Sequence, residues 1–163
     1  MAEMFSTMTT RVSRPSSRSV RYLTLGALAA ITLTPSLSGQ DLPARRSCAD
    51  VTTQAALNEC FAYNARQAAL TLQMLLGELQ AELSQDEYQQ LVSIQGLWEQ
   101  YRDQHCEWRA AFFGRGSIGP TIYWSCMEHQ TDLRVDALKL LLCEGAGMTG
   151  PCAASRKYDR PEL

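Results

Sequence analysis

Cysteine has the most distinctive chemistry of the residue types in this sequence. The six cysteines are Cys48, Cys60, Cys106, Cys126, Cys143 and Cys152. Thiolates can bind a metal, act as nucleophiles or pair as disulfides. No two of the six have the CxxC spacing of a zinc site, and the chain holds only two histidines. We therefore expect three disulfides, with no metal and no cofactor.

The sequence leaves the pairing of four of these cysteines open. Local pairing joins Cys48 to Cys60 and Cys106 to Cys126, and each bridge then closes a short loop against a helix end. Crossed pairing, which includes Cys60 with Cys106, staples the open end of a helical hairpin instead. We favour local pairs because Cys106 and Cys126 flank the same glycine-rich segment.

Catalytic groups are sparse in the sequence. His105 and Cys106 are neighbours, but adjacent residues point about 100° apart on a helix, so they do not form a dyad. His105 falls on an apolar stripe, where a packing role is expected. Asp86 and Glu87 stand at a helix start, where capping and the helix dipole explain them. We predict a protein that is not an enzyme.

Two sets of carboxylates recur at every fourth residue. The sets are Glu99, Asp103 and Glu107, and Glu128, Asp132 and Asp136. Like charges at this spacing cost a few tenths of a kcal/mol per pair, so each stripe needs an explanation. One interpretation is a solvated surface with basic neighbours, namely Arg102, Arg109, Arg134 and Lys139. The other is an acidic face that steers a cationic partner.

Helices are the elements that must position these residues. From Thr53 to Leu83, apolar residues recur three and four apart. Ser84 and Glu87 then form a capping-box pattern that begins a second helix. Its apolar stripe, which we expect to be core, is Leu91, Ile94, Trp98, Tyr101, His105, Trp108 and Phe112. The segment 114–120 (GRGSIGP) ends this helix.

A third helix is predicted from about Ile122 to Leu142, with Met127, Leu133, Ala137 and Leu141 on its apolar side. The predicted fold is all-α: a small disulfide-stapled bundle of three main helices with a long antiparallel helical hairpin. Residues 48–142 form this domain. Residues 143–163 lack periodicity and are expected to be a loosely ordered tail, pinned by a Cys143–Cys152 bridge.

The N-terminus has the pattern of a secretory signal peptide. A cationic stretch precedes an apolar run of 12 residues at 22–33, and small residues follow it. The run is too short to cross a bilayer, so no stable membrane insertion is expected after cleavage. We assign residues 1–38 to the signal peptide and 39–47 to a short linker.

Cleavage after residue 38 makes the chain acidic. It removes four of 15 basic and one of 17 acidic residues, which leaves 11 and 16 and a net charge of −5. An acidic chain is not expected to bind nucleic acid. The even number of cysteines indicates an oxidising compartment, so we expect a periplasmic or secreted protein.

The second helix also carries the pattern QxxWxxYRDxxC. Its residues are Gln95, Trp98, Tyr101, Arg102, Asp103 and Cys106, followed by Gly114-Arg115-Gly116-Ser117, Cys126, Thr131 and Arg134. Over about residues 48–142 the chain resembles the LprI-type lysozyme inhibitor N-terminal domain family. The resemblance implies an exported helical domain whose partner is lysozyme or another cationic envelope protein.

Two surfaces are candidates for such a contact: the acidic stripes, and the segment Gly114–Pro120 with Arg115 and Ser117. The alternative is an accessory or structural envelope protein that has a different partner and is not an enzyme. Its oligomeric state does not follow from the sequence.

The sequence departs from the family pattern on the first helix. Ala69 stands near a position where relatives usually carry an acidic residue. Arg102 and Arg134 then need other partners, for which Glu59 and Asp103 are candidates. An unpaired buried charge is costly.

Overall fold

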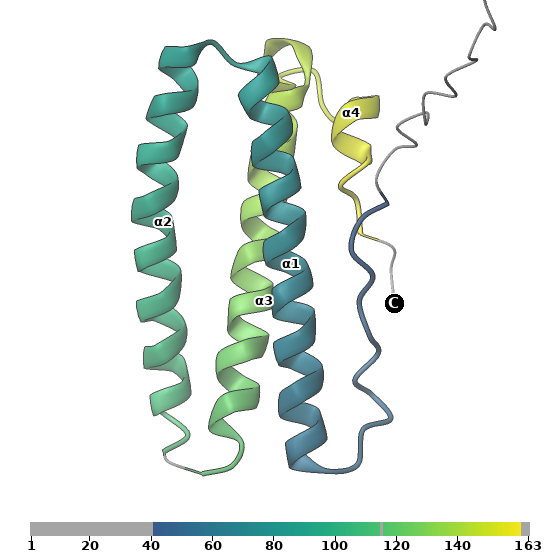
Figure 1. The fold of residues 1–163 in the computed structure, drawn as a ribbon, viewed down its shortest axis with the longest axis vertical. Coiled ribbons are helices and arrows are strands. Elements are labelled where there is room, and N and C mark those ends of the chain that lie inside the picture. Colours follow the sequence, from purple (N-terminus) through teal and green to yellow (C-terminus); the bar gives the residue numbers. More distant parts are fainter. Residues whose placement is uncertain (1–40, 115, 161–163) are drawn as a thin grey trace, which may run out of the picture. The chain divides into compact units, whose positions relative to one another are not determined.

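The computed structural model describes residues 41–114 and 116–160, and these residues form an all-α bundle (Figure 1). Its elements are α1 (Gln54–Glu82), α2 (Gln85–Ala111), α3 (Gly119–Leu138), the 3-10 turns η1 (Lys139–Leu142) and η2 (Glu144–Gly147), and α4 (Ala153–Arg156). The predicted disulfide-stapled helical bundle is confirmed. The expected signal peptide and Arg115 lie outside the described residues.

Local sequence signals set the ends of the long helices. The Thr53 side chain accepts a hydrogen bond from the backbone N–H of Ala56 at the start of α1. At the start of α2, the Ser84 hydroxyl accepts from the Glu87 N–H, while the Glu87 carboxylate accepts from the Ser84 N–H at 3.0 Å. The predicted capping box is therefore confirmed, and it starts α2 directly after α1.

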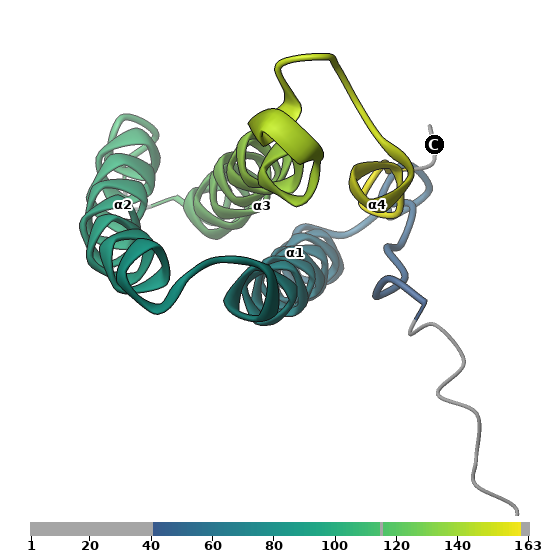
Figure 2. The same cartoon turned by 90° about the horizontal axis from the view of Figure 1, so that it is seen from above.

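Helix α3 is the common packing partner of the two longer helices. It packs against α1 along most of its length and against α2, whereas α1 and α2 touch each other only slightly (Figure 2). The hairpin is antiparallel as predicted, but α2 contributes only Leu91 to the buried core cluster. The buried cluster is made of Leu72, Leu75, Leu79, Leu91, Val135, Leu138 and Tyr158.

The predicted core stripe of α2 is wrong for most of its members. Leu91 is buried, but Ile94, Tyr101, Trp108 and Phe112 have more than half of their surface exposed. The fully buried positions of α2 are Leu91, Gln95 and Cys106. The physical reason is that α2 packs on α3 and not on α1, so a face rotated away from the apolar stripe is covered.

The same correction applies to α3. Leu133 and Ala137 were expected on its apolar side, and both are exposed. The helix instead buries Cys126, Thr131, Asp132, Val135 and Leu138. Because α3 has neighbours on two sides, polar residues with internal partners occupy positions that a simple periodic pattern assigns to solvent.

The C-terminal segment is not the loosely ordered tail that the sequence suggested. Tyr158 is fully buried in the main core. The Lys157 ammonium contacts the Glu78 carboxylate of α1, and Arg160 Nη1 lies 2.7 Å from Asp132 Oδ2 of α3. This segment therefore folds back onto the bundle. The Cys143–Cys152 bridge expected for it is present.

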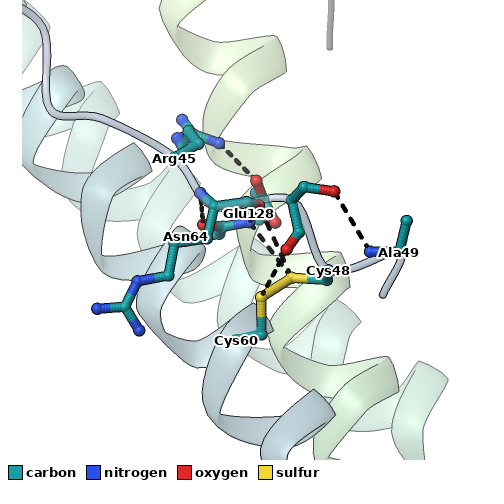
Figure 3. Close-up of a disulfide and its surroundings, with 8 residues drawn as sticks. Arg45, Cys48, Ala49, Cys60, Asn64 and Glu128 are labelled. Atoms are coloured by element: carbon teal, nitrogen blue, oxygen red, sulfur yellow. Dashed lines mark hydrogen bonds and ion pairs between the residues drawn. A yellow bond between two sulfur atoms is a disulfide. The ribbon is translucent and has the colours of Figure 1, made fainter. Parts of the chain in front are cut away.

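The segment before α1 also packs on the bundle. The Arg46 N–H donates to Asn64 Oδ1 at 2.9 Å, and Asn64 Nδ2 donates back to the Arg46 carbonyl at 3.0 Å. The Cys48–Cys60 disulfide follows directly. These hydrogen bonds and the disulfide hold residues 41–53, which we call the strap, against α1 (Figure 3). Leu42 packs against the core from the same strap.

All three disulfides are local, and the favoured pairing is confirmed. Cys48 is bonded to Cys60 and Cys106 to Cys126. The second bridge joins α2 to α3 across the glycine-rich turn. Among residues 41–114 and 116–160, no helix has the length and apolar character that crossing a bilayer requires.

Candidate binding surfaces

The carboxylates of α3 are paired inside the molecule. Arg45 Nη1 donates to Glu128 Oε1 at 2.6 Å, and its Nη2 donates to Asp132 Oδ1 at 2.7 Å (Figure 3 shows the Arg45–Glu128 pair). Arg160 holds the other oxygen of Asp132, whose side chain is only 4% exposed. Asp136 is bound by Lys139 at 2.8 Å. This stripe therefore fastens the strap and the C-terminal segment to α3.

Burial and pairing have opposite effects on the pKa values of the groups in the ion pair between the strap and α3. Burial acts to lower the pKa of Arg45, but the hydrogen bonds and charges of Asp132 and Glu128 raise it overall. Burial raises the pKa of Glu128, and the neighbouring Asp132 charge adds to this, so the single bond from Arg45 does not compensate. Asp132 is thus the main partner of Arg45, and the pKa of Glu128 stays above its ordinary value.

The carboxylates of α2 are open to solvent. Glu99 and Glu107 are exposed, and the side chain of Asp103 is 49% exposed although Arg102 binds it at 2.8 Å. Burial raises the pKa of Tyr123, and the charges of Asp103 and Glu107 raise it further. The α2 carboxylates therefore form a negatively charged surface, and their charges affect the pKa of Tyr123 on the neighbouring helix α3.

The QxxWxxYRDxxC pattern builds the joint between α2 and α3. Gln95 is buried and accepts a hydrogen bond from Arg134 Nε at 3.0 Å. Both Arg102 and Arg134 lie over the Trp98 ring, at 5.0 and 5.6 Å from its centre. Cys106 completes the joint through its bridge to α3. Most of the pattern thus holds the fold together.

The two motif arginines differ in how they are satisfied. Arg102 pairs with Asp103, one of the two expected partners, and also donates to the Thr131 hydroxyl at 3.4 Å. Arg134 Nη2 is buried without a hydrogen-bond partner among the described residues. Burial lowers the pKa of Arg134. Its main compensation is the Trp98 ring, through a cation–π contact.

Tyr101 is the member of the pattern that does not join the helices. It belongs to a continuous apolar row on α2, which we call the aromatic stripe: Ile94, Leu97, Tyr101, His105, Trp108 and Phe112. Neighbouring rings touch along the row, with centres 5.5 Å apart for Tyr101 and His105 and 4.8 Å apart for Trp108 and Phe112. The helical spacing of these residues is visible in the sequence, but their exposure to solvent is not.

A small hollow lies where the three helices approach one another. It is lined by Ala65, Arg66, Ala69, Arg102, Trp124, Met127 and Thr131. Cys106 is bonded to α3, and Arg102 lies about 40° around α2 from it, at the hollow. Continuing around the axis of α2 in the same direction, the next side chains are those of Trp98, His105 and Tyr101. The aromatic stripe therefore begins at the edge of this hollow.

The glycine-rich turn is anchored to the start of α1. Asn58 Nδ2 donates to the Ser117 carbonyl at 3.3 Å, and Asn58 also accepts a hydrogen bond from the Thr121 hydroxyl. Gly114 has φ +67°, a left-handed conformation that favours glycine at the end of α2. The Ser117 side chain is exposed. Residues 116–120 of the turn are thus held against α1 at the surface.

These features define a disulfide-stapled helical domain whose distinctive side chains lie on exposed faces rather than in a reaction pocket. All six cysteines are in disulfides, so none is available as a nucleophile. The chain belongs to the family described as lysozyme inhibitor LprI, whose model matches residues 45–138. The resemblance noted in the sequence is therefore confirmed. No curated protein and no solved structure matches the chain.

Proposed function

We propose that this protein is an exported binding module that inhibits a cationic muramidase through the acidic face of α2. That face is defined by Glu99, Asp103 and Glu107. The family description supplies the class of partner. The three disulfides fit an oxidising compartment, periplasmic or extracellular, in which such a partner would be met.

The observation that carries the proposal is the difference between the two carboxylate sets. Glu128 and Asp132 of α3 are bound by arginines of the same chain. Glu99 and Glu107 of α2 are exposed. A cationic protein can therefore be attracted by Glu99 and Glu107 without breaking internal ion pairs, and exposed charges act chiefly by steering association.

The turn Gly114–Pro120 supports the same surface. It begins three residues beyond Ala111, the last residue of α2, and seven beyond Glu107, and it is anchored to α1 through Asn58. An inhibitor needs contacts that persist after encounter, and a fixed turn with an exposed Ser117 supplies backbone groups for them. We therefore include Ser117, and Arg115 beside it, in the proposed contact.

A titration of the protein into lysozyme tests the proposal, with residual muramidase activity as the measurement. Inhibition should weaken as salt rises from low to physiological ionic strength, where charges are screened over about 8 Å. The triple variant Glu99→Gln, Asp103→Asn, Glu107→Gln should associate at least about tenfold more slowly at low salt. Helix and side-chain volume are kept, so the fold should be unchanged.

A matched control removes the same charge elsewhere. Asp41, Glu82 and Glu144 are exposed and belong neither to the acidic face of α2 nor to the turn Gly114–Pro120. Their triple amide variant should inhibit as the wild type does. If both triple variants inhibit equally, the contact lies elsewhere. If the wild-type protein inhibits no lysozyme, the accessory envelope protein becomes the better assignment.

A further inference from the structure

The aromatic stripe of α2 is the largest apolar feature left uncovered on the described surface. Leu97 is 66% exposed and Phe112 is 72% exposed, with Tyr101 and Trp108 close to 60%. Exposed residues of this type usually occur singly on soluble proteins. Here they form one row along about five turns of a single helix, and the rings from Tyr101 to Phe112 contact one another in sequence. Such a row needs a covering partner.

The size of the stripe fits a protein interface. Its large apolar side chains together expose about 600 Å², at the upper limit for patches on monomers. A standard interface covers about 800 Å² on each partner, including its polar rim. Tyr and Trp are also the residue types that anchor interfaces most strongly. The stripe and its borders therefore suffice for one stable contact.

The order of residues along the stripe suits a second copy of the same chain. When the row is reversed about residue 103, each of its members falls within one residue of another member. If two α2 helices lie antiparallel, Tyr101 faces His105 of the second copy and Leu97 faces its Trp108. A two-fold contact of this kind is self-complementary, as closed dimers require.

The charges around the stripe permit this contact. Gln90 and Gln104 border it and are uncharged. Glu99, Asp103 and Glu107 lie on the other side of the helix, with Asp103 about 160° from Tyr101, while Asp86 and Glu87 stand in the first turn of α2, outside the row. A second copy therefore meets no row of like charge. A cationic partner, in contrast, is attracted to the opposite side of α2, so it does not compete for the stripe.

From these observations we infer that the aromatic stripe is a dimer interface, in which α2 of one copy lies antiparallel to α2 of the second. The two acidic faces then point away from the contact, and the dimer presents two of them. The inference does not depend on the proposed lysozyme contact, because it uses a different side of α2.

Sedimentation velocity on the exported protein with its disulfides intact tests the inference. The wild type should change from monomer to dimer as its concentration rises from micromolar towards millimolar. Trp108→Lys should weaken the dimer at least about tenfold, because a central aromatic contact is lost and a charge is introduced. Val92→Lys is the matched control, since Val92 is 46% exposed on the acidic side of the same helix. It should leave the dimer unchanged.

Complementation tests the antiparallel arrangement. Leu97→Lys and Trp108→Glu should each weaken the homodimer. Each substitution occurs in both copies, so it places a charge against an apolar residue at two points of the contact. In a mixture of the two variants, Lys at position 97 of one chain faces Glu at position 108 of the other. The mixed dimer should therefore be at least about tenfold tighter than either homodimer. Circular dichroism verifies that each variant is folded.

Three results would overturn the inference. One is a wild-type protein that stays monomeric throughout the concentration range. Another is a dimer that Trp108→Lys and Val92→Lys affect equally. The third is a mixture of Leu97→Lys and Trp108→Glu that binds no more tightly than either variant alone. Lysozyme inhibition, measured on the same variants, separates the two proposals. If Trp108→Lys abolishes inhibition while the wild type is monomeric, the stripe is a lysozyme contact and not a dimer interface.

Discussion

The two carboxylate sets have the same spacing on neighbouring helices and opposite environments. On α3, Asp132 is buried between Arg45 and Arg160, and Glu128 shares Arg45. On α2, Glu99 and Glu107 face solvent. One set binds the chain to itself and the other is free for a partner. Spacing on a helix therefore does not reveal which role a row of charges has.

Distant cations cause the difference. Arg45 is 87 residues from Asp132 and Arg160 is 28 residues from it, and both lie in segments outside the three long helices. The basic residues near the α3 set in sequence contribute little of this pairing, apart from Lys139. Among the residues that the structure describes, the cation paired with the α2 set is Arg102, which binds Asp103. The terminal segments thus decide which carboxylates remain available.

The largest effect should come from removing the buried carboxylate. Asp132→Ala leaves two arginines without their shared partner, and breaking a buried pair costs about 4 kcal/mol of unfolding free energy. Glu99→Ala removes an exposed carboxylate and should change stability by no more than about 0.5 kcal/mol. Urea denaturation at neutral pH measures both. Equal losses of unfolding free energy would mean that the α2 and α3 carboxylates do not differ in how they contribute to stability.

The next effect concerns the bridge that fixes the orientation of α2. Replacing both Cys106 and Cys126 by alanine opens a loop with a sequence separation of 20 residues. Loop entropy predicts a loss of about 3 kcal/mol. Because α2 has little contact with α1, the loss should be concentrated in α2.

Amide hydrogen exchange distinguishes this local loss from a general one. Protection should fall more in α2 than in α1. The double alanine variant of Cys143 and Cys152 is the control, since that bridge closes a shorter loop at the other end of the chain. Uniform loss of protection across all three helices would contradict the view that α2 depends on its single joint with α3.

Local signals in the sequence were sufficient for the elements of the fold. The three long helices, the capping box at Ser84 and the local disulfides all depend on residues close together in the chain. The face that each helix buries was not predictable in the same way. Tyr101 and Trp108 belong to a clear apolar period, and they are exposed because α2 has one neighbour instead of two.

The candidate site shows the same limit. Exposure of Glu99 and pairing of Asp132 could not be separated in the sequence, because Arg45 and Arg160 lie outside the periodic segments. Tyr158 stands in a stretch with no periodicity and is nevertheless fully buried. Non-local contacts of the terminal segments are responsible in each case.

The smallest effect is a difference in how two glutamates respond to pH. Burial raises the pKa of Glu128 on α3, so between its unfolded and folded pKa the native state holds more protons than the unfolded chain. Its contribution to stability is therefore greatest in acid and declines as the pH rises through this window. Hydrogen bonds from Ser84 lower the pKa of Glu87 on α2, and its contribution to stability is present above about pH 4.5 and lost as the pH falls below it.

Unfolding of the wild type, Glu128→Gln and Glu87→Gln, measured from about pH 3 to 7, gives each contribution by difference. The two difference curves should slope in opposite directions, and a common slope would mean that the attraction of Arg45 outweighs the burial of Glu128.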